Sequence, residues 1–193
     1  MELVFATNNR HKIGEVQHLL KNKIALLSLQ NIHCIDELPE TGNTLQENAL
    51  QKARYVHSKF AVNCFADDTG LEIEALNGRP GVYSARYGGE EKSAEKNIEK
   101  VLAEMKGINK RNAFFTTVIS LIINNKVHLF EGKIGGILAT EIKGNQGFGY
   151  DPLFIPAGHT KSFAEMELEE KNKISHRAIA VKKLAEFLNT LSA

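Results

Sequence analysis

Two long runs of β-branched and aromatic residues constrain the fold of this chain more than any other feature. They cover Ala113–Ile123 and Val127–Leu138, and the pair Asn124-Asn125 joins them. Because asparagine tolerates the positive φ angles of a tight turn, the pattern predicts an antiparallel hairpin of two long strands. Any fold for this chain must therefore accommodate that hairpin.

Strand and helix patterns alternate over most of the remaining chain. Short apolar runs predict strands at Leu3–Ala6, Ile24–Leu29, residues 62–68 and Leu71–Leu76, with one more within the glycine-rich stretch Gly144–Pro156. Apolar residues at helical spacing predict helices over residues 13–20, 44–60, Ser93–Met105 and Ser175–Leu191. Thr44 and Glu47 form a capping-box pattern at the start of the second helix. These units and the hairpin together predict an α/β fold with a mixed sheet.

The size and composition of the chain restrict the function classes that are open to it. The 193 residues are enough for one large domain or two small lobes around a cleft. A net charge of +1 produces no strong electrostatic attraction to nucleic acid or to a membrane. We find no apolar stretch of transmembrane length and no signal-peptide pattern. With two cysteines in no metal-ligand pattern, these features favour a cytoplasmic protein that binds neither nucleic acid nor membrane.

Two adjacent carboxylates, Asp67 and Asp68, follow the apolar run of residues 62–66. We expect the strand to end at this pair and Thr69-Gly70 to form a turn, at the sheet edge where open sheets bind ligands. Neighbouring carboxylates repel each other unless a cation lies between them, and Mg²⁺ prefers carboxylate oxygens. The pattern indicates a magnesium site; the alternative is a strand end followed by a turn with both aspartates in solvent.

A polar segment between the first strand and the first helix is a candidate anion site. It consists of Thr7, Asn8, Asn9, Arg10, His11 and Lys12. The start of a helix offers free N–H groups to an anion, and the basic side chains add positive charge. The spacing is not that of a Walker loop. The alternative is a helix cap with exposed basic residues.

Two glutamates could complete a cation site with Asp68. Glu40 lies in the loop before the second helix, and Glu47 lies in the first turn of that helix. Glu47 already has a structural explanation as the capping-box acid. Glu40 has none, although glutamates in surface loops are common. The second metal ligand is therefore open between Glu40, Glu47 and Asp67, with Glu40 preferred.

Two further motifs carry polar and aromatic side chains suited to a flat ligand. In Gly147–Pro152, the glycines allow a flat group to stack on Phe148, and Asp151 can accept hydrogen bonds from a base edge. Before the last helix, Ser175 is a plausible N-cap, followed by His176 and Arg177. Cations are unfavourable at a helix start, which indicates a compensating ligand such as phosphate or carbonyl oxygens. The alternatives are a turn with core aromatics and a basic surface patch.

Taken together, these motifs resemble those of the inosine triphosphate pyrophosphatases, the Ham1-type enzymes, over nearly the whole chain. The family motifs and the segments that match them are T-x-N-x-x-K at Thr7–Lys12, A-D-D-S-G-L at Ala66–Leu71, P-G-x-Y-S-A-R-Y at Pro80–Tyr87, G-F-G-Y-D-P at Gly147–Pro152 and K-x-x-x-S-H-R at Lys171–Arg177. The resemblance implies a single domain over residues 1–193, with a strongly twisted mixed sheet in two lobes around a cleft. It also implies a homodimer.

The resemblance implies an activity as well. Enzymes of this type hydrolyse the purine nucleotides ITP, dITP and XTP to the monophosphate and pyrophosphate with Mg²⁺. Asp68 is then the catalytic residue and, with Glu40, a metal ligand, and water attacks the α-phosphorus. The expected substrate-binding residues are Thr7, Asn8, Asn9, Arg10, His11, Lys12, Lys52, Thr69, Phe148, Gly149, Tyr150, Asp151, Lys171, His176 and Arg177.

The expected selectivity follows from the 6-oxo group of hypoxanthine and xanthine. Donors from His176 and Arg177 would satisfy this group and would face an unpaired donor in ATP. Phe148 would stack on the purine, while Lys171 and Asp151 would frame its edge. The rejection of GTP has no residue assigned to it, because guanine also carries the 6-oxo group.

Two departures from the family pattern and three alternative functions accompany this interpretation. Thr69 stands where the family commonly has serine, and Pro39 stands where it often has a second acid beside Glu40. The alternatives are a Maf-like pyrophosphatase for pyrimidine or modified nucleotides, a nucleotide sensor without hydrolysis, and a dimeric interaction domain. Only the hydrolases would release pyrophosphate in a metal-dependent way.

Overall fold

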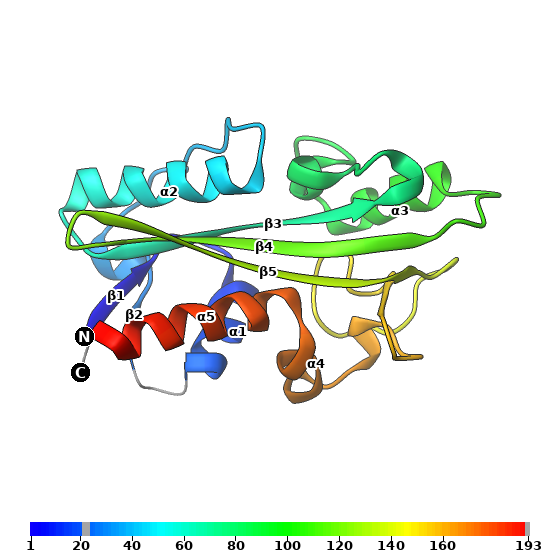
Figure 1. The fold of residues 1–193 in the computed structure, drawn as a ribbon. Coiled ribbons are helices and arrows are strands. Elements are labelled where there is room, and N and C mark those ends of the chain that lie inside the picture. Colours follow the sequence, from blue (N-terminus) through cyan, green and yellow to red (C-terminus); the bar gives the residue numbers. More distant parts are fainter. Residues whose placement is uncertain (21–23, 192–193) are drawn as a thin grey trace. The chain divides into compact units, whose positions relative to one another are not determined.

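A computed structural model describes residues 1–20 and 24–191 and confirms the predicted α/β class (Figure 1). Its six-stranded sheet has the order β2-β1-β3-β4-β5-β6. The strands are β1 (Glu2–Phe5), β2 (Ala25–Leu27), β3 (Cys64–Ile73), β4 (Asn112–Ile123), β5 (Lys126–Leu138) and β6 (Phe154–Pro156). The sheet is mixed because β1 pairs in parallel with β2 and β3, whereas β5 and β6 are antiparallel.

Five α-helices accompany the sheet within the described residues. They are α1 (Arg10–Leu20), α2 (Leu45–Phe60), α3 (Ala94–Glu104), α4 (Leu168–Ile174) and α5 (His176–Leu191). The predicted capping box of α2 is confirmed, since Thr44 and Glu47 bond each other's backbone N–H groups. None of the helices in the described part of the chain has the length and apolar character needed to cross a membrane.

The chain forms two compact units. Unit 1 contains Met1–Asp68, Thr117–Gly132 and Arg177–Ala193, and unit 2 contains Thr69–Thr116 and Lys133–His176. The long strands β3, β4 and β5 contribute residues to both units. The clusters of functional side chains described below each belong to one unit.

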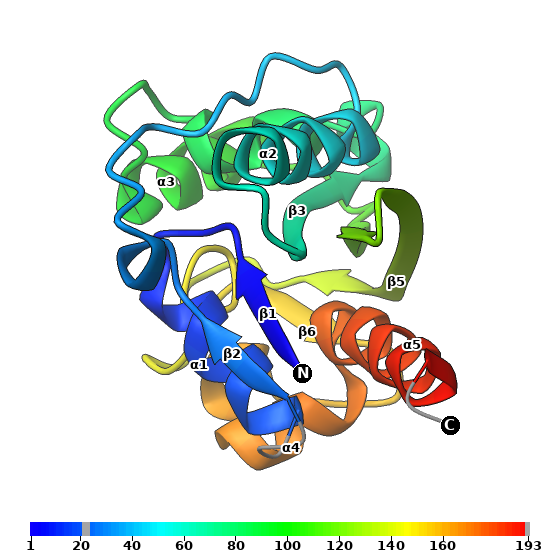
Figure 2. The ribbon, with the colours of Figure 1, turned by 90° about the vertical axis from the view of Figure 1, so that its left-hand side faces the viewer.

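Unit 1 buries apolar side chains on both faces of its strands. Helix α2 covers one face, and α1 and α5 cover the other (Figures 1 and 2). Along β3, Cys64 and Ala66 belong to the cluster under α2, whereas Phe65 belongs to the cluster that α1 and α5 cover and stacks on Phe5 at 4.4 Å. Successive side chains of a strand point to opposite faces. The two residues that follow, Asp67 and Asp68, are therefore directed to different sides of the sheet.

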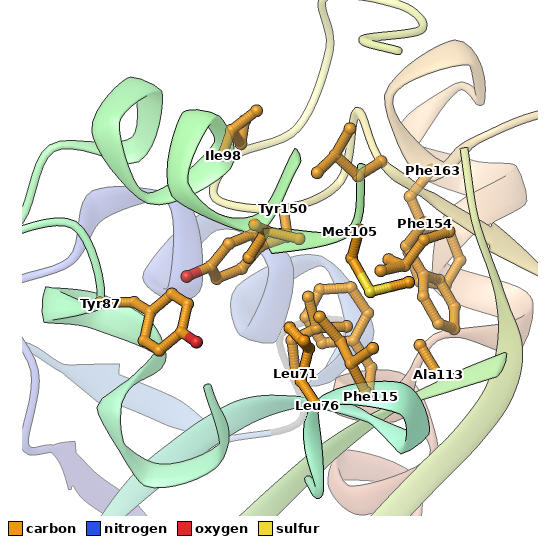
Figure 3. Close-up of a cluster of buried hydrophobic side chains, with 14 of the residues drawn as sticks. Leu71, Leu76, Tyr87, Ile98, Met105, Ala113, Phe115, Tyr150, Phe154 and Phe163 are labelled. Carbon is orange, nitrogen blue, oxygen red and sulfur yellow. The ribbon is translucent and has the colours of Figure 1, made fainter. Parts of the chain in front are cut away.

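Unit 2 has its own aromatic core, part of which Figure 3 shows. Phe115 and Phe154 meet edge to face with ring centroids 4.8 Å apart, and Phe163 lies 5.3 Å from Phe154. Tyr150 is buried in the same cluster, and its hydroxyl donates to the carbonyl oxygen of Ser84 at 2.9 Å. This core supports the segments that carry the candidate residues of unit 2.

The prediction that a strand ends at Asp67-Asp68 was wrong. Strand β3 continues without interruption to Ile73, so Thr69-Gly70 is not a turn and Leu71–Leu76 is not a separate strand. Leu71 and Ile73 are fully buried in the core of unit 2, and this burial keeps the chain extended across Gly70. Packing between distant segments thus overrides the local turn signal of Thr-Gly.

The hairpin prediction is confirmed, and the region before the last helix contains an additional short helix. Asn124 and Asn125 both adopt positive φ, at 49° and 60°, between β4 and β5. The segment before α5, for which no element was predicted, forms the short helix α4, which contains Lys171. Ser175 ends α4 in an extended conformation directly before α5 begins at His176.

Candidate active site

Asp68 lies in a buried group of polar side chains on the α2 face of unit 1. We call Glu40, Asn48, Lys52 and Asp68 the Asp68 cluster. The side-chain amide of Asn48 donates to Asp68 Oδ2 at 3.2 Å, and Lys52 Nζ lies 3.6 Å from Asp68 Oδ1. The same ammonium group forms an ion pair with Glu40. Two carboxylates from separate segments therefore face one cationic group.

The electrostatics of this cluster set Asp68 apart from an ordinary aspartate. Burial raises the pKa of Asp68, although Lys52 and Lys12 oppose that rise. Burial also acts against the charge on Lys52, but the attraction of Asp68 and Glu40 is stronger and raises the pKa of Lys52. A carboxylate that is buried at a cost to its charged form is typical of functional sites. The arrangement suits a group that binds a cation or accepts a proton.

Asp67 lies in a different cluster on the opposite face of β3. We call Lys12, Glu15, Asp67 and Arg177 the Asp67 cluster. Lys12 Nζ pairs with Asp67 Oδ1 at 2.8 Å, and Arg177 Nη2 lies 3.3 Å from Asp67 Oδ2. Arg177 Nη1 also pairs with Glu15 at 2.6 Å, and Arg177 itself is only 1% exposed. Asp67 is thus paired with two cations, whereas Asp68 faces Lys52.

These ion pairs make Asp67 a source of pH-dependent stability. Burial disfavours its charge, but Lys12 and Arg177 outweigh this and hold the pKa of Asp67 well below its ordinary value of 3.8. A depressed carboxyl pKa contributes stability above the ordinary value, and the contribution is lost as the pH falls through the folded-state pKa. We therefore expect the free energy of unfolding to decrease as the pH falls below about 3.8.

Urea denaturation of the wild type and of Asp67→Asn between pH 3 and pH 7 checks this expectation. The variant lacks the titrating carboxyl group, so the stability difference between the two proteins should be largest near neutral pH and should narrow as the pH falls. A difference that stays constant over this range would remove Asp67 as the source of the effect.

The segment Thr7–Lys12 begins α1, and part of it caps the helix. Asn9 Oδ1 accepts from the backbone N–H groups of His11 at 3.0 Å and Lys12 at 3.2 Å. Thr7 Oγ1 accepts from the Asn9 N–H at 3.2 Å. Asn8, Arg10 and His11 are exposed. The helix cap of the alternative interpretation is therefore present, and the exposed basic residues remain able to attract an anion.

A third group of candidate residues comes together in unit 2. We call Phe148, Asp151 and Lys171 the Asp151 cluster. Asp151 Oδ2 accepts from the Phe148 N–H at 2.8 Å and from Lys171 Nζ at 2.6 Å. The same ammonium lies 5.0 Å from the ring centroid of Phe148. The His176 ring stacks on Phe115 with centroids 4.5 Å apart. An aromatic ring, a buried ion pair and an imidazole are thus held by one unit.

The remaining predicted residues have distinct environments. Gly147 has a φ of +70°, and a Cβ at this position would lie 2.1 Å from Asp151 Oδ2, so glycine is required there. Gly149 also has a positive φ, of 61°. Tyr150 is a core residue, as the alternative interpretation held for it. Thr69 is half-buried on β3, next to Asp68.

Two residues of these clusters were missed by the sequence analysis. Asn48 lies one helical turn before Lys52, and Glu15 lies one turn after Lys12. Both are buried, at 1% and 5% exposure. The available signal was a polar residue at a position where the helical spacing calls for an apolar one. Glu47 was correctly explained as the capping-box acid.

The chain is similar over nearly its full length to named proteins and to solved structures. The model of the Ham1 family matches residues 3–187. The dITP/XTP pyrophosphatase of Porphyromonas gingivalis is 54% identical over 188 residues, which are 97% of each chain. That of Bacillus subtilis is 46% identical over 191 residues, which are 97% of this chain and 96% of the relative.

Solved structures extend the similarity to the fold. The Ham1 protein of Staphylococcus aureus has a TM-score of 0.89 at 38% identity, and the match covers 98% of this chain and 99% of the other. A HAM1 protein of Coxiella burnetii has a TM-score of 0.90 at 37% identity, with the same coverage. The mixed sheet with flanking helices is therefore shared with these structures.

Proposed function

Because the chain belongs to the Ham1 family, we propose that it hydrolyses the non-canonical purine nucleotides dITP, XTP and ITP to the monophosphate and pyrophosphate. The relatives named above support this activity and its place among hydrolases of triphosphate anhydrides. The observation that carries the proposal is the Asp68 cluster, in which a buried carboxylate faces an ammonium group and a second carboxylate. Such a cluster can bind a polyphosphate and its counter-ion.

The donors of the Asp68 cluster fit Mg²⁺ as the cofactor. Asp68 and Glu40 both contact Lys52, so their oxygens are directed at one cationic position. No group of three or more His, Cys, Asp or Glu side chains converges within the described residues. Mg²⁺ at nucleotide sites is commonly held by one or two carboxylates together with waters and phosphates, and Asp68 and Glu40 supply these two. When bound, Mg²⁺ would polarise the phosphate oxygens and the attacking water.

The residues of unit 1 have separate roles in the proposed reaction. Asp68 orients the attacking water and accepts its proton. Lys52 neutralises the charge that develops on the leaving pyrophosphate. Arg10 and His11, exposed at the start of α1, attract the triphosphate. Water attacks the α-phosphorus, and the bond between this phosphorus and the oxygen that bridges to the β-phosphate breaks. The bridging oxygen leaves as part of pyrophosphate.

The Asp151 cluster of unit 2 is the proposed site for the purine base. Phe148 presents its ring for stacking, and Asp151 and Lys171 frame the base edge. His176 donates to the 6-oxo group of hypoxanthine or xanthine. Arg177 donates three N–H groups to Glu15 and Asp67, so its proposed role is to position Asp67. A site that donates a hydrogen bond to the 6-oxo acceptor leaves the 6-amino donor of adenine unpaired.

The assembly and the cellular location also belong to the proposal. We propose a homodimer that works in the cytoplasm on free nucleotides and uses neither nucleic acid nor a membrane. The low net charge of +1 agrees with a small-molecule substrate that is bound locally.

Pyrophosphate release from dITP, XTP, ITP, GTP and ATP at equal concentration tests the activity. We expect release from dITP, XTP and ITP, with kcat/KM at least about a hundredfold higher than for ATP. EDTA should abolish the reaction, and Mg²⁺ should restore it. Release of single phosphates would contradict attack on the α-phosphorus. Turnover confined to pyrimidine nucleotides would support the Maf-like alternative, and binding without turnover would support a sensor.

A further inference from the structure

The side chain of Asn48 joins two parts of the Asp68 cluster. It lies on α2 and is only 1% exposed. Its Oδ1 accepts from the backbone N–H of Gly42 at 2.8 Å, and its Nδ2 donates to Asp68 Oδ2 at 3.2 Å. One amide group therefore ties the segment that carries Glu40 to the carboxylate of Asp68.

The chemistry of the two partners determines the orientation of this amide. The Gly42 N–H can only donate, and an ionised Asp68 carboxylate can only accept. Rotating the amide by half a turn would set two donors against each other at Gly42 and two acceptors against each other at Asp68. Because neither arrangement forms a hydrogen bond in a buried site, the amide keeps a single orientation.

This orientation distinguishes the two oxygens of Asp68. Oδ2 is held by Asn48, and Oδ1 faces the ammonium group of Lys52 at 3.6 Å. The loop that carries Glu40 and Gly42 also lies close to Asn48, since a Cβ on Gly42 would lie 2.9 Å from Asn48 Oδ1. The loop, the amide and the carboxylate therefore form one connected arrangement.

We propose that Asn48 is a positioning residue for the pyrophosphatase reaction, because it orients the Asp68 carboxylate and holds the Glu40 segment beside it. The proposal rests on the function proposed above. A carboxylate with one oxygen fixed presents the other in one direction. Without the Asn48 amide, the carboxylate of Asp68 rotates about its last side-chain bond, and its distance from Glu40 varies. Misplacement of about 1 Å near a reacting group costs on the order of a hundredfold in rate.

Gln51 supplies a matched control on the same helix. Its side chain holds the same loop through Thr41, with two hydrogen bonds of 2.9 Å to the backbone N–H and the hydroxyl. Both of these hydrogen bonds end on Thr41 and not on Asp68. Comparing Asn48→Leu with Gln51→Ala therefore separates the orientation of Asp68 from simple anchoring of the loop.

The experiment measures kcat and KM for dITP, Mn²⁺ binding without nucleotide by electron paramagnetic resonance, and the urea midpoint. For Asn48→Leu we expect kcat to fall about a hundredfold, KM to stay within about threefold, and Mn²⁺ affinity to fall about tenfold. Gln51→Ala should stay within about threefold of the wild type in all three constants. Equal losses in both variants would overturn the proposal in favour of loop anchoring.

Asn48→Asp identifies which of the two hydrogen bonds matters. An ionised aspartate can still accept from Gly42 but cannot donate to Asp68. Gln51→Glu adds the same charge one turn along the helix as a control. We expect Asn48→Asp to lose kcat as Asn48→Leu does, and Gln51→Glu to retain it. Wild-type kcat in Asn48→Asp would overturn the proposal. This variant also decides the question if Asn48→Leu does not fold.

The design separates this proposal from the activity on which it rests. If the wild type releases no pyrophosphate from dITP, XTP or ITP, the proposed function fails, while Mn²⁺ binding still compares the variants. Weaker Mn²⁺ binding in Asn48→Leu with unchanged binding in Gln51→Ala then supports the positioning role. Equal Mn²⁺ binding in the two variants overturns it.

Discussion

Asp68→Asn should lower kcat for dITP by at least about a hundredfold while leaving the protein folded. Asparagine has nearly the same shape and can still accept the hydrogen bond from Asn48. It cannot accept a proton from water, and it is a weaker ligand for Mg²⁺. The loss should therefore appear in turnover and in metal binding, which steady-state kinetics and Mn²⁺ titration measure.

The stability of Asp68→Asn distinguishes a catalytic loss from a folding defect. Burial raises the pKa of Asp68, so the folded protein at neutral pH carries a charge that costs stability relative to the unfolded chain. Replacing it with a neutral amide removes this cost, and we expect the urea midpoint to be unchanged or higher. Asp36→Asn, at an aspartate paired with Lys59, is the control and should retain activity. Normal turnover in Asp68→Asn would remove Asp68 from the mechanism.

Arg177→Met should cause a large loss of stability, of roughly 3–5 kcal/mol in the free energy of unfolding. Arg177 is 1% exposed and pairs with both Glu15 and Asp67. Methionine fills a similar volume but leaves two buried carboxylates with one cation fewer. Breaking a buried ion pair is costly because the remaining charges lose their compensation. Urea denaturation at pH 7 measures the effect.

Two further variants serve as controls for the predicted loss of stability in Arg177→Met. Lys59→Met removes a cation from the exposed pair with Asp36, and exposed pairs contribute little, so its urea midpoint should stay near that of the wild type. Adding Glu15→Gln to Arg177→Met removes one of the uncompensated charges and should restore part of the stability. If Arg177→Met unfolds at the wild-type midpoint, the buried pairs are not important for the fold.

Local features of the fold were predictable from the sequence because they depend on neighbouring residues. The hairpin required only two β-branched runs and the pair Asn124-Asn125, which adopts the expected positive φ. The start of α2 required only Thr44 and Glu47, three residues apart. By contrast, the local turn signal at Thr69-Gly70 failed, because the burial of Leu71 in a core built from distant segments keeps β3 extended.

The class of fold, the family resemblance and most of the polar residues of the three clusters follow from the amino-acid sequence alone. How these residues are paired depends on the packing of the folded chain. Asp67 and Asp68 are adjacent in sequence, yet β3 directs them to opposite faces and to different cations. Arg177 and Glu15 are 162 positions apart and still form an ion pair. A sequence motif shows which chemical groups are present. Sheet order and helix packing bring distant segments together, and the pairing of charges depends on that proximity.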